Sequence, residues 1–234
     1  MARLRSLVFE AADPAGLARF WADALEWSFL EHEGGRSVAA GGDGELRRLE
    51  FVGSSGAKTS ANWTHFDLAT RSLEHQQATV ARLVGLGARH LDIGQGPDAA
   101  HVVLADPEDN EFCVLEPGNR FVDDGGLLGS LSSDGSRAAG VFWSEVLGWP
   151  LVWDQDDETA IRPASGTGLF ITFGGTPDPS RRESNRLVLE LVATADGEVD
   201  RLVALGATRI DDGQGGDVVH LSDPDGNAFR ILVE

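Results

Sequence analysis

An internal repeat constrains the fold of this chain more than any other feature of its sequence. Motifs of the first half return about 120 positions later in the second half. Three pairs of segments carry the repeat: VARLVGLGA at 80–88 with VDRLVALGA at 199–207, DPEDN at 106–110 with DPDGN at 223–227, and FW at 20–21 with FW at 142–143. Self-similarity at such a spacing indicates repeated folding units. We therefore predict two domains, residues 1–117 and residues 118–234.

Each half divides again into two units, each a strand, a helix and a short meander of strands. Residues 4–12 form an apolar run, after which Asp13 and Pro14 supply the residues that favour the start of a helix. Residues 64–70 alternate between apolar and polar side chains, as a strand with one buried face does. We expect each half to form one open curved sheet, with its two helices on the convex side and His65 and Asp67 on the concave side.

The motifs FWADALEW at 20–27, HFDL at 65–68 and DPEDNEF at 106–112, in this layout, resemble the vicinal oxygen chelate superfamily of glyoxalase and bleomycin-resistance proteins. The resemblance covers nearly the whole chain. It implies an α+β, glyoxalase/bleomycin-resistance-like fold, in which four βαβββ units pair into two domains with curved, partly open sheets. The superfamily contains isomerases, ring-cleaving dioxygenases, antibiotic-modifying enzymes and proteins that only bind a drug, so the resemblance does not select one activity.

Composition excludes several classes of partner. The hydrophobic content is 41%, and no apolar run approaches the roughly 18 residues of a membrane span, so we expect no membrane partner. The formal charge of -19 opposes binding to nucleic acid, because phosphate contacts need a basic surface. Cys113 is the only cysteine, which fits a reducing, cytoplasmic location. A monomer acting as an internal pseudo-dimer, or a homodimer, is expected.

The resemblance also indicates where a site would lie. In the superfamily a divalent metal is held on the concave side by His or Gln near the start of a unit and Glu near its end. His65 matches this pattern, whereas Ser6 and Cys113 stand where a His and a Glu would be expected. The pocket candidates of the first half are Glu50, Trp63, His65, Asp67, Glu111 and Cys113. His65 and Glu50 would be the ligands of any metal.

The second half departs further from the metal-binding pattern. Leu127, Val188 and Arg230 stand at the corresponding positions, so we expect no metal there. Arg230 shares its expected concave face with Glu190, and the two are expected to pair. The second domain would then mainly support the first.

Three functions remain open from the sequence. The first is binding of a small organic molecule in the concave cavity of the first domain, without a metal or other cofactor. The second is a metal-dependent lyase, isomerase or dioxygenase using zinc, nickel, manganese or iron, which would need a complete ligand set. The third is a non-catalytic protein that binds a partner.

Overall fold

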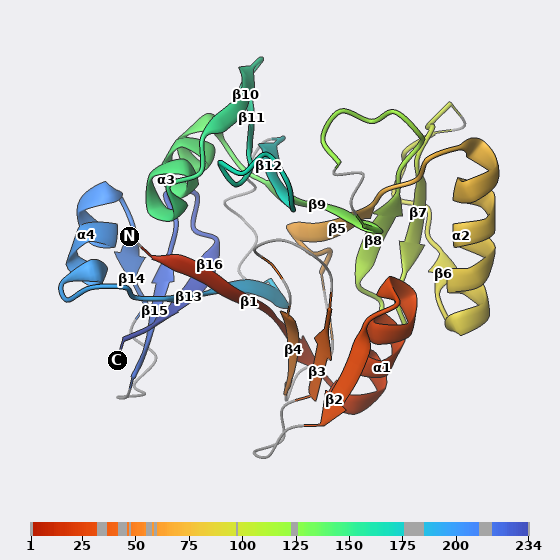
Figure 1. Cartoon of the computed structure of the whole chain (residues 1–234), viewed down its shortest axis with the longest axis horizontal. Helices are drawn as coiled ribbons and strands as arrows, with labels where there is room; N and C mark the ends of the chain where they lie inside the picture. Colours follow the sequence, from red (N-terminus) through yellow and green to blue (C-terminus); the bar gives the residue numbers. More distant parts are fainter. Residues whose placement is uncertain are drawn as a thin grey trace.

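The computed structural model describes residues 2–31, 37–41, 46, 48–54, 58, 60–96, 98–122, 126–175, 185–210 and 217–233. Its helices and strands form four successive βαβββ units (Figure 1). Unit 1 comprises β1 (Arg3–Ala11), α1 (Pro14–Leu25), β2 (Ser28–Glu31), β3 (Ser37–Ala40) and β4 (Arg48–Gly53). Unit 2 comprises β5 (Thr64–Leu68), α2 (Leu73–Leu86), β6 (Arg89–His90), β7 (Val102–Ala105) and β8 (Glu111–Val114).

The second half repeats this order of elements. Unit 3 comprises β9 (Leu128–Asp134), α3 (Arg137–Leu147), β10 (Leu151–Gln155), β11 (Glu158–Ile161) and β12 (Phe170–Gly174). Unit 4 comprises β13 (Leu187–Val192), α4 (Glu198–Leu205), β14 (Thr208–Arg209), β15 (Val218–Ser222) and β16 (Ala228–Leu232). The expected α+β fold of four βαβββ units is confirmed.

The four units form two curved, open sheets of eight strands each. Sheet A joins unit 4 to unit 1 in the order β14-β15-β16-β13-β1-β4-β3-β2, and sheet B joins unit 3 to unit 2 in the order β10-β11-β12-β9-β5-β8-β7-β6. Each sheet is joined at its centre by antiparallel first strands, β1 with β13 and β5 with β9. The expectation that each half builds its own sheet is therefore wrong. The boundaries 1–117 and 118–234 stay a prediction.

Units of the same half pack together through their helical faces. The Trp21 ring of α1 contacts Phe66 and Phe112 of unit 2, with ring centroids 5.0 and 5.1 Å away. The Trp143 ring of α3 contacts Phe229 of unit 4 in the same way, at 4.9 Å. These aromatic side chains are buried and belong to the hydrophobic core. The apolar cores thus join units within each half, whereas the sheets join opposite halves.

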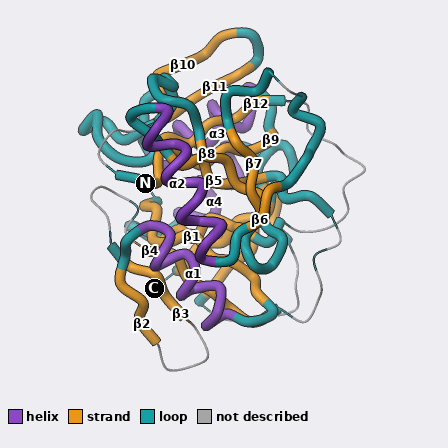
Figure 2. The backbone as a smooth tube through the Cα atoms, turned by 90° about the vertical axis from the view of Figure 1, so that its right-hand side faces the viewer, coloured by secondary structure: helices purple, strands orange, loops and turns teal. Residues whose placement is uncertain are grey.

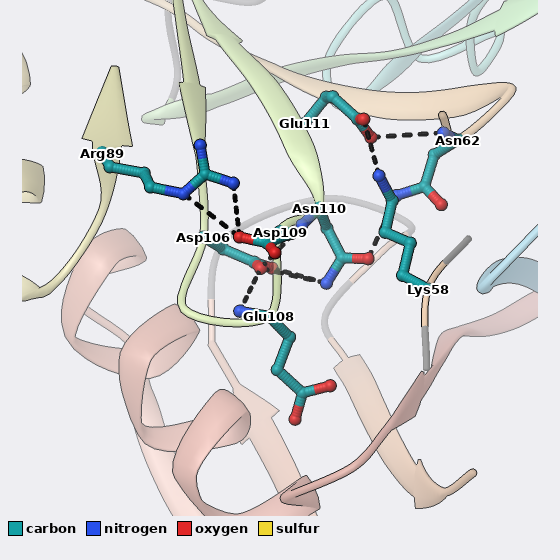
Figure 3. Close-up of polar contacts among 8 residues, drawn as sticks. All are labelled: Lys58, Asn62, Arg89, Asp106, Glu108, Asp109, Asn110 and Glu111. Carbon is teal, nitrogen blue, oxygen red and sulfur yellow. Dashed lines mark hydrogen bonds and ion pairs between the residues drawn. The ribbon is translucent and has the colours of Figure 1, made fainter. Parts of the chain in front are cut away.

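The repeated Asp-Pro turn, whose internal contacts Figure 3 shows, holds α1 from the neighbouring unit. The Asp106 carboxylate accepts the backbone N–H groups of Glu108 and Asn110 and the indole N–H of Trp21. Glu108 in turn accepts the backbone N–H groups of Ala12 and Asp13, at the start of α1. These bonds satisfy donors that a helix N-terminus leaves free. The turn therefore has a structural role.

The same arrangement holds α3 in the second half. Asp225 accepts the backbone N–H and the hydroxyl of Ser136, the N-cap residue of α3. At the other ends of the helices, Arg82 donates to the carbonyls of Asp23 and Ala24 in α1, and Arg201 donates to those of Glu145 and Val146 in α3. Each inner helix is therefore held at both ends by the following unit.

The outer helices α2 and α4 lie at opposite edges of the molecule in Figure 1. Turned by 90°, Figure 2 shows β2 and β3 at the bottom and β10 and β11 at the top. Helix α2 ends at Leu86 and is capped by Gly87, which has φ 115°. Glycine adopts this left-handed conformation without steric cost. Within the described residues, no helix is long and apolar enough to cross a membrane.

Candidate functional site

Strands β5 and β8 bring three titratable side chains together on the concave side of sheet B. Asp67 and Cys113 are direct neighbours in the parallel pairing of β5 with β8, and His65 lies two residues before Asp67 on the same face. One possible ligand atom from each of these three residues lies within 4.8 Å of the other two. His65 Nε2 is 3.4 Å from Asp67 Oδ1.

The second half of the chain completes this cluster. In the antiparallel pairing of β5 with β9, Asp67 faces Ser130 and His65 faces Ser132. The Ser130 hydroxyl donates to Asp67 Oδ2 at 3.0 Å, and the Ser132 hydroxyl bonds to the same oxygen. Ser132 is also 2.8 Å from the Thr172 hydroxyl on β12. A polar chain therefore runs across β12, β9, β5 and β8.

The surroundings shift the pKa of all three titratable groups. Burial by itself lowers the pKa of His65, but hydrogen bonds to Asp67 and Cys113 and the charges of these partners raise it well above 6.5. Burial favours a higher pKa for Asp67, but His65, Ser132 and Ser130 lower the pKa below its usual value. Burial raises the pKa of the Cys113 thiol above 9.0, against the effect of His65. These shifts favour an imidazolium–carboxylate pair beside a neutral thiol.

A cavity of about 280 Å³ opens beside His65 on the concave side of sheet B. The strand register links unit 2 to unit 3 through a row of cross-strand neighbours, His65, Ser132, Thr172, Ala160 and Trp153. All of these residues except Ala160 line the cavity. Phe121, Asp134, Glu158 and Gly174 line the cavity further along. Most of the lining residues therefore come from the second half.

The segment that connects the two halves forms one side of this region. The Phe121 ring meets the Trp153 ring edge-on at 5.5 Å, and the Arg120 guanidinium lies 5.1 Å from the centre of the same indole. Val122 packs against the apolar group formed by Val103, Cys113 and Leu115. The connection thus covers Cys113 on one side and contributes Phe121 to the cavity wall.

The concave side of sheet A carries a different set of charges. Glu190 accepts the guanidinium of Arg230 at 2.6 Å and the hydroxyl of Ser6 at 3.0 Å, and it also pairs with Arg5. The expected pair of Arg230 with Glu190 is therefore confirmed. Glu50, with 0% of its surface exposed, accepts the Arg48 guanidinium at 2.7 Å.

The structure brings only three of the six pocket candidates together. His65, Asp67 and Cys113 come together, whereas Glu50 lies in sheet A with Arg48, so a metal site made of His65 and Glu50 is not formed. Glu111 accepts hydrogen bonds from Lys58 Nζ at 2.6 Å and from the backbone N–H of Asn62 (Figure 3), and it does not belong to the group of His65, Asp67 and Cys113. Trp63 is half-buried before β5 and does not line the cavity.

Sequence reasoning missed the contribution of unit 3, because the second domain was expected only to support the first. The signals were the alternation of Ser130 and Ser132 along β9 and the aromatic Trp153 in β10. The cavity belongs to units 2 and 3 together. It is not a cavity of residues 1–117 alone, because β9 to β12 supply half of sheet B.

The metal set implied by the family fold does not fit these residues. In sheet B the strands of unit 3 place Ser130, Ser132 and Thr172 on the face that carries His65, Asp67 and Cys113. Unit 3 therefore contributes hydroxyls, which are neutral oxygen donors, next to the cluster. Both oxygens of Asp67 already face hydrogen-bond donors, and the raised pKa values of His65 and Cys113 oppose the loss of protons that metal binding requires.

Comparison with known proteins agrees with this architecture. The most similar solved structures include glyoxalase I from Zea mays, with 15% identity, a TM-score of 0.63, and coverage of 100% of this chain and 92% of that chain. A putative dioxygenase from Bacillus subtilis has 14% identity and a TM-score of 0.60, with coverage of 99% and 84%. At these identities the likeness shows the fold alone. None of the curated proteins compared matches the sequence.

The family described as the glyoxalase-like domain matches two segments, residues 6–115 and 130–232. These segments cover most of the chain and coincide with its two repeats. The chain therefore belongs to the glyoxalase-like domain family.

Proposed function

We propose that this protein binds a small organic molecule in the concave cavity of sheet B, without a metal. The observation that carries the proposal is the cavity itself, about 280 Å³ in volume, with aromatic side chains beside the polar row of His65, Ser132 and Thr172. Ligand sites in proteins are typically concave, mainly apolar and furnished with a few polar groups that orient the ligand. The hydrogen-bond chain through Asp67 holds the polar row in place before a ligand arrives.

Gly174 offers a direct test, because it lines the cavity on the same face as Thr172, two residues earlier on β12. A side chain added there would meet Glu158 Cγ at 3.4 Å, an ordinary contact, so Gly174→Phe should fill the cavity without distorting the strand. Gly53 is the matched control. It ends β4 as Gly174 ends β12, and a side chain there meets nothing within 4 Å.

The experiment is a screen of small charged and neutral compounds by saturation-transfer NMR on the native protein and both variants. Compounds that bind the native protein should lose binding in Gly174→Phe and keep it in Gly53→Phe, with thermal unfolding confirming that both variants fold. Binding that survives Gly174→Phe unchanged would place the ligand elsewhere and refute the proposal.

The second candidate function is a metal-dependent enzyme, and one observation favours it. One possible ligand atom each from His65, Asp67 and Cys113 lies within 4.8 Å of the others, which is compact enough for a zinc site with an open position. Calorimetric titration with zinc, nickel, manganese and iron(II) decides between the two candidates. Tight binding that is lost in Cys113→Ser would replace the metal-free proposal, whereas weak binding that is insensitive to this change supports it.

A further inference from the structure

We infer that the ligand of the sheet B cavity is a small organic cation with an apolar body, an inference that rests on the proposed function. The charged groups lining the cavity are unequal in sign: Asp134 and Glu158 are carboxylates, and none of the described lining residues is lysine or arginine. His65, the remaining titratable lining residue, is paired with Asp67. The Asp67 carboxylate therefore balances any positive charge on His65.

The two carboxylates lie close to one another around Gly174. Asp134 on β9 is the register partner of Gly174 on β12, and Glu158 Cγ lies 3.4 Å from the position that a Gly174 side chain would take. Among the described residues, no hydrogen bond or ion pair engages the Glu158 side chain. Because glycine leaves the space between the two carboxylates open, a ligand group can approach Glu158 there.

Aromatic rings stand beside this acidic part of the cavity. Trp153 and Phe121 both line the cavity and contact each other edge-on. Trp153 already makes one cation–π contact, because the Arg120 guanidinium lies 5.1 Å from its ring centre. Arg120 itself does not line the cavity. Aromatic faces attract cations through the ring quadrupole, and organic cations are commonly recognised by aromatic walls together with carboxylates. This combination favours a cationic head on an apolar body.

The charge of the whole chain acts in the same direction. A formal charge of -19 raises the local concentration of cations and lowers that of anions near the protein. An anionic ligand would have to overcome both this field and the two carboxylates of the cavity. Glu158 is exposed, and a neutral ligand would form no ion pair with it.

The test uses three probes that share a benzyl group: benzyltrimethylammonium, neutral N-benzylacetamide and anionic phenylmethanesulfonate. Calorimetry at constant ionic strength should show that the cation binds about tenfold or more tightly than the neutral probe, as expected for a cation between aromatic and acidic groups. Glu158→Gln should weaken binding of the cation several-fold and leave the neutral probe unchanged. Glu145→Gln, an equal charge change at an exposed residue of α3, should alter neither.

The outcomes separate this inference from the function on which it rests. If the neutral or anionic probe binds as tightly as the cation and Gly174→Phe abolishes that binding, the cavity is a ligand site but the cation class is wrong. If Glu158→Gln and Glu145→Gln weaken the cation equally, the attraction belongs to the overall charge and the assignment of Glu158 is overturned. Binding of no probe to the native protein overturns both proposals.

Discussion

Replacing Asp67 by Asn tests whether the His65–Asp67 pair forms as the structure shows it. Asp67 is 6% exposed and accepts two serine hydroxyls besides facing His65. Breaking a fully buried ion pair costs several kcal/mol, but the His65 side chain is 31% exposed, so water compensates part of the loss. We expect Asp67→Asn to lower the free energy of unfolding by about 1–3 kcal/mol near pH 6.

The pH dependence of this loss has a definite sign. The pKa of His65 is raised in the folded protein, so its stabilising contribution is complete below the unfolded pKa of about 6.5 and disappears as pH rises through the folded pKa. The pKa of Asp67 is lowered, so its contribution is present above about 3.9 and disappears as pH falls through the folded pKa. The difference between native protein and variant should therefore be largest between these limits and shrink at both extremes.

Two measurements check this prediction. Urea unfolding followed by tryptophan fluorescence should show the loss, and thermal unfolding near pH 6 should show a midpoint lower by roughly 2–12 °C for a chain of this size. NMR titration should place the His65 pKa well above 6.5 in the native protein and lower in Asp67→Asn. Glu158→Gln, which removes a carboxylate of the same cavity, is the control and should change stability little at any pH. A native His65 pKa at or below 6.5 would refute the pairing.

Three further predictions concern stability, each measured by urea unfolding. Glu108→Gln should lower the free energy of unfolding by about 1–2 kcal/mol, because the N-terminus of α1 loses a charged acceptor. A loss as small as that of a substitution at an exposed residue would contradict the role of Glu108 in holding α1. Arg230→Met should cost about 1–3 kcal/mol by leaving buried Glu190 with fewer partners, and it should leave cavity binding intact. Gly140→Ala should lower the free energy of unfolding by about 1–3 kcal/mol, because its Cβ would lie 1.9 Å from Thr159 Oγ1. Gly85→Ala, whose side chain meets open space, should raise the free energy of unfolding by about 0.5–1 kcal/mol. Equal effects of the two substitutions would contradict the packing of α3 on β11.

The site shows where sequence reasoning succeeded and where it ended. Alternation along residues 64–70 correctly placed His65 and Asp67 on one face, because the side-chain period of a strand is a local property. Cys113 joined them because it occupies a matching position in its unit. Glu50 was grouped with them because it lies in the last strand of the first unit, in the same half of the chain, and the structure places it in the other sheet, beside Arg48.

The sequence by itself determined the units and their number. Helix starts at Pro14, turns such as the one closed by Asp106, and strand faces follow from contacts within a few residues, which local sequence encodes. Because these elements recur in both halves, the family resemblance and the fold class could be predicted from the sequence.

Only the tertiary structure decided which units share a sheet. The first strand of every unit has an edge that can accept any of the others, and backbone hydrogen bonds do not distinguish between them. Pairing of β5 with β9 brings Ser130, Ser132 and Trp153 to the same concave face of sheet B as His65. Pairing of β1 with β13 places Arg5, Glu190 and Arg230 together on the concave face of sheet A. This choice depends on packing between residues far apart in the chain, so the cavity and its lining appear only in the folded molecule.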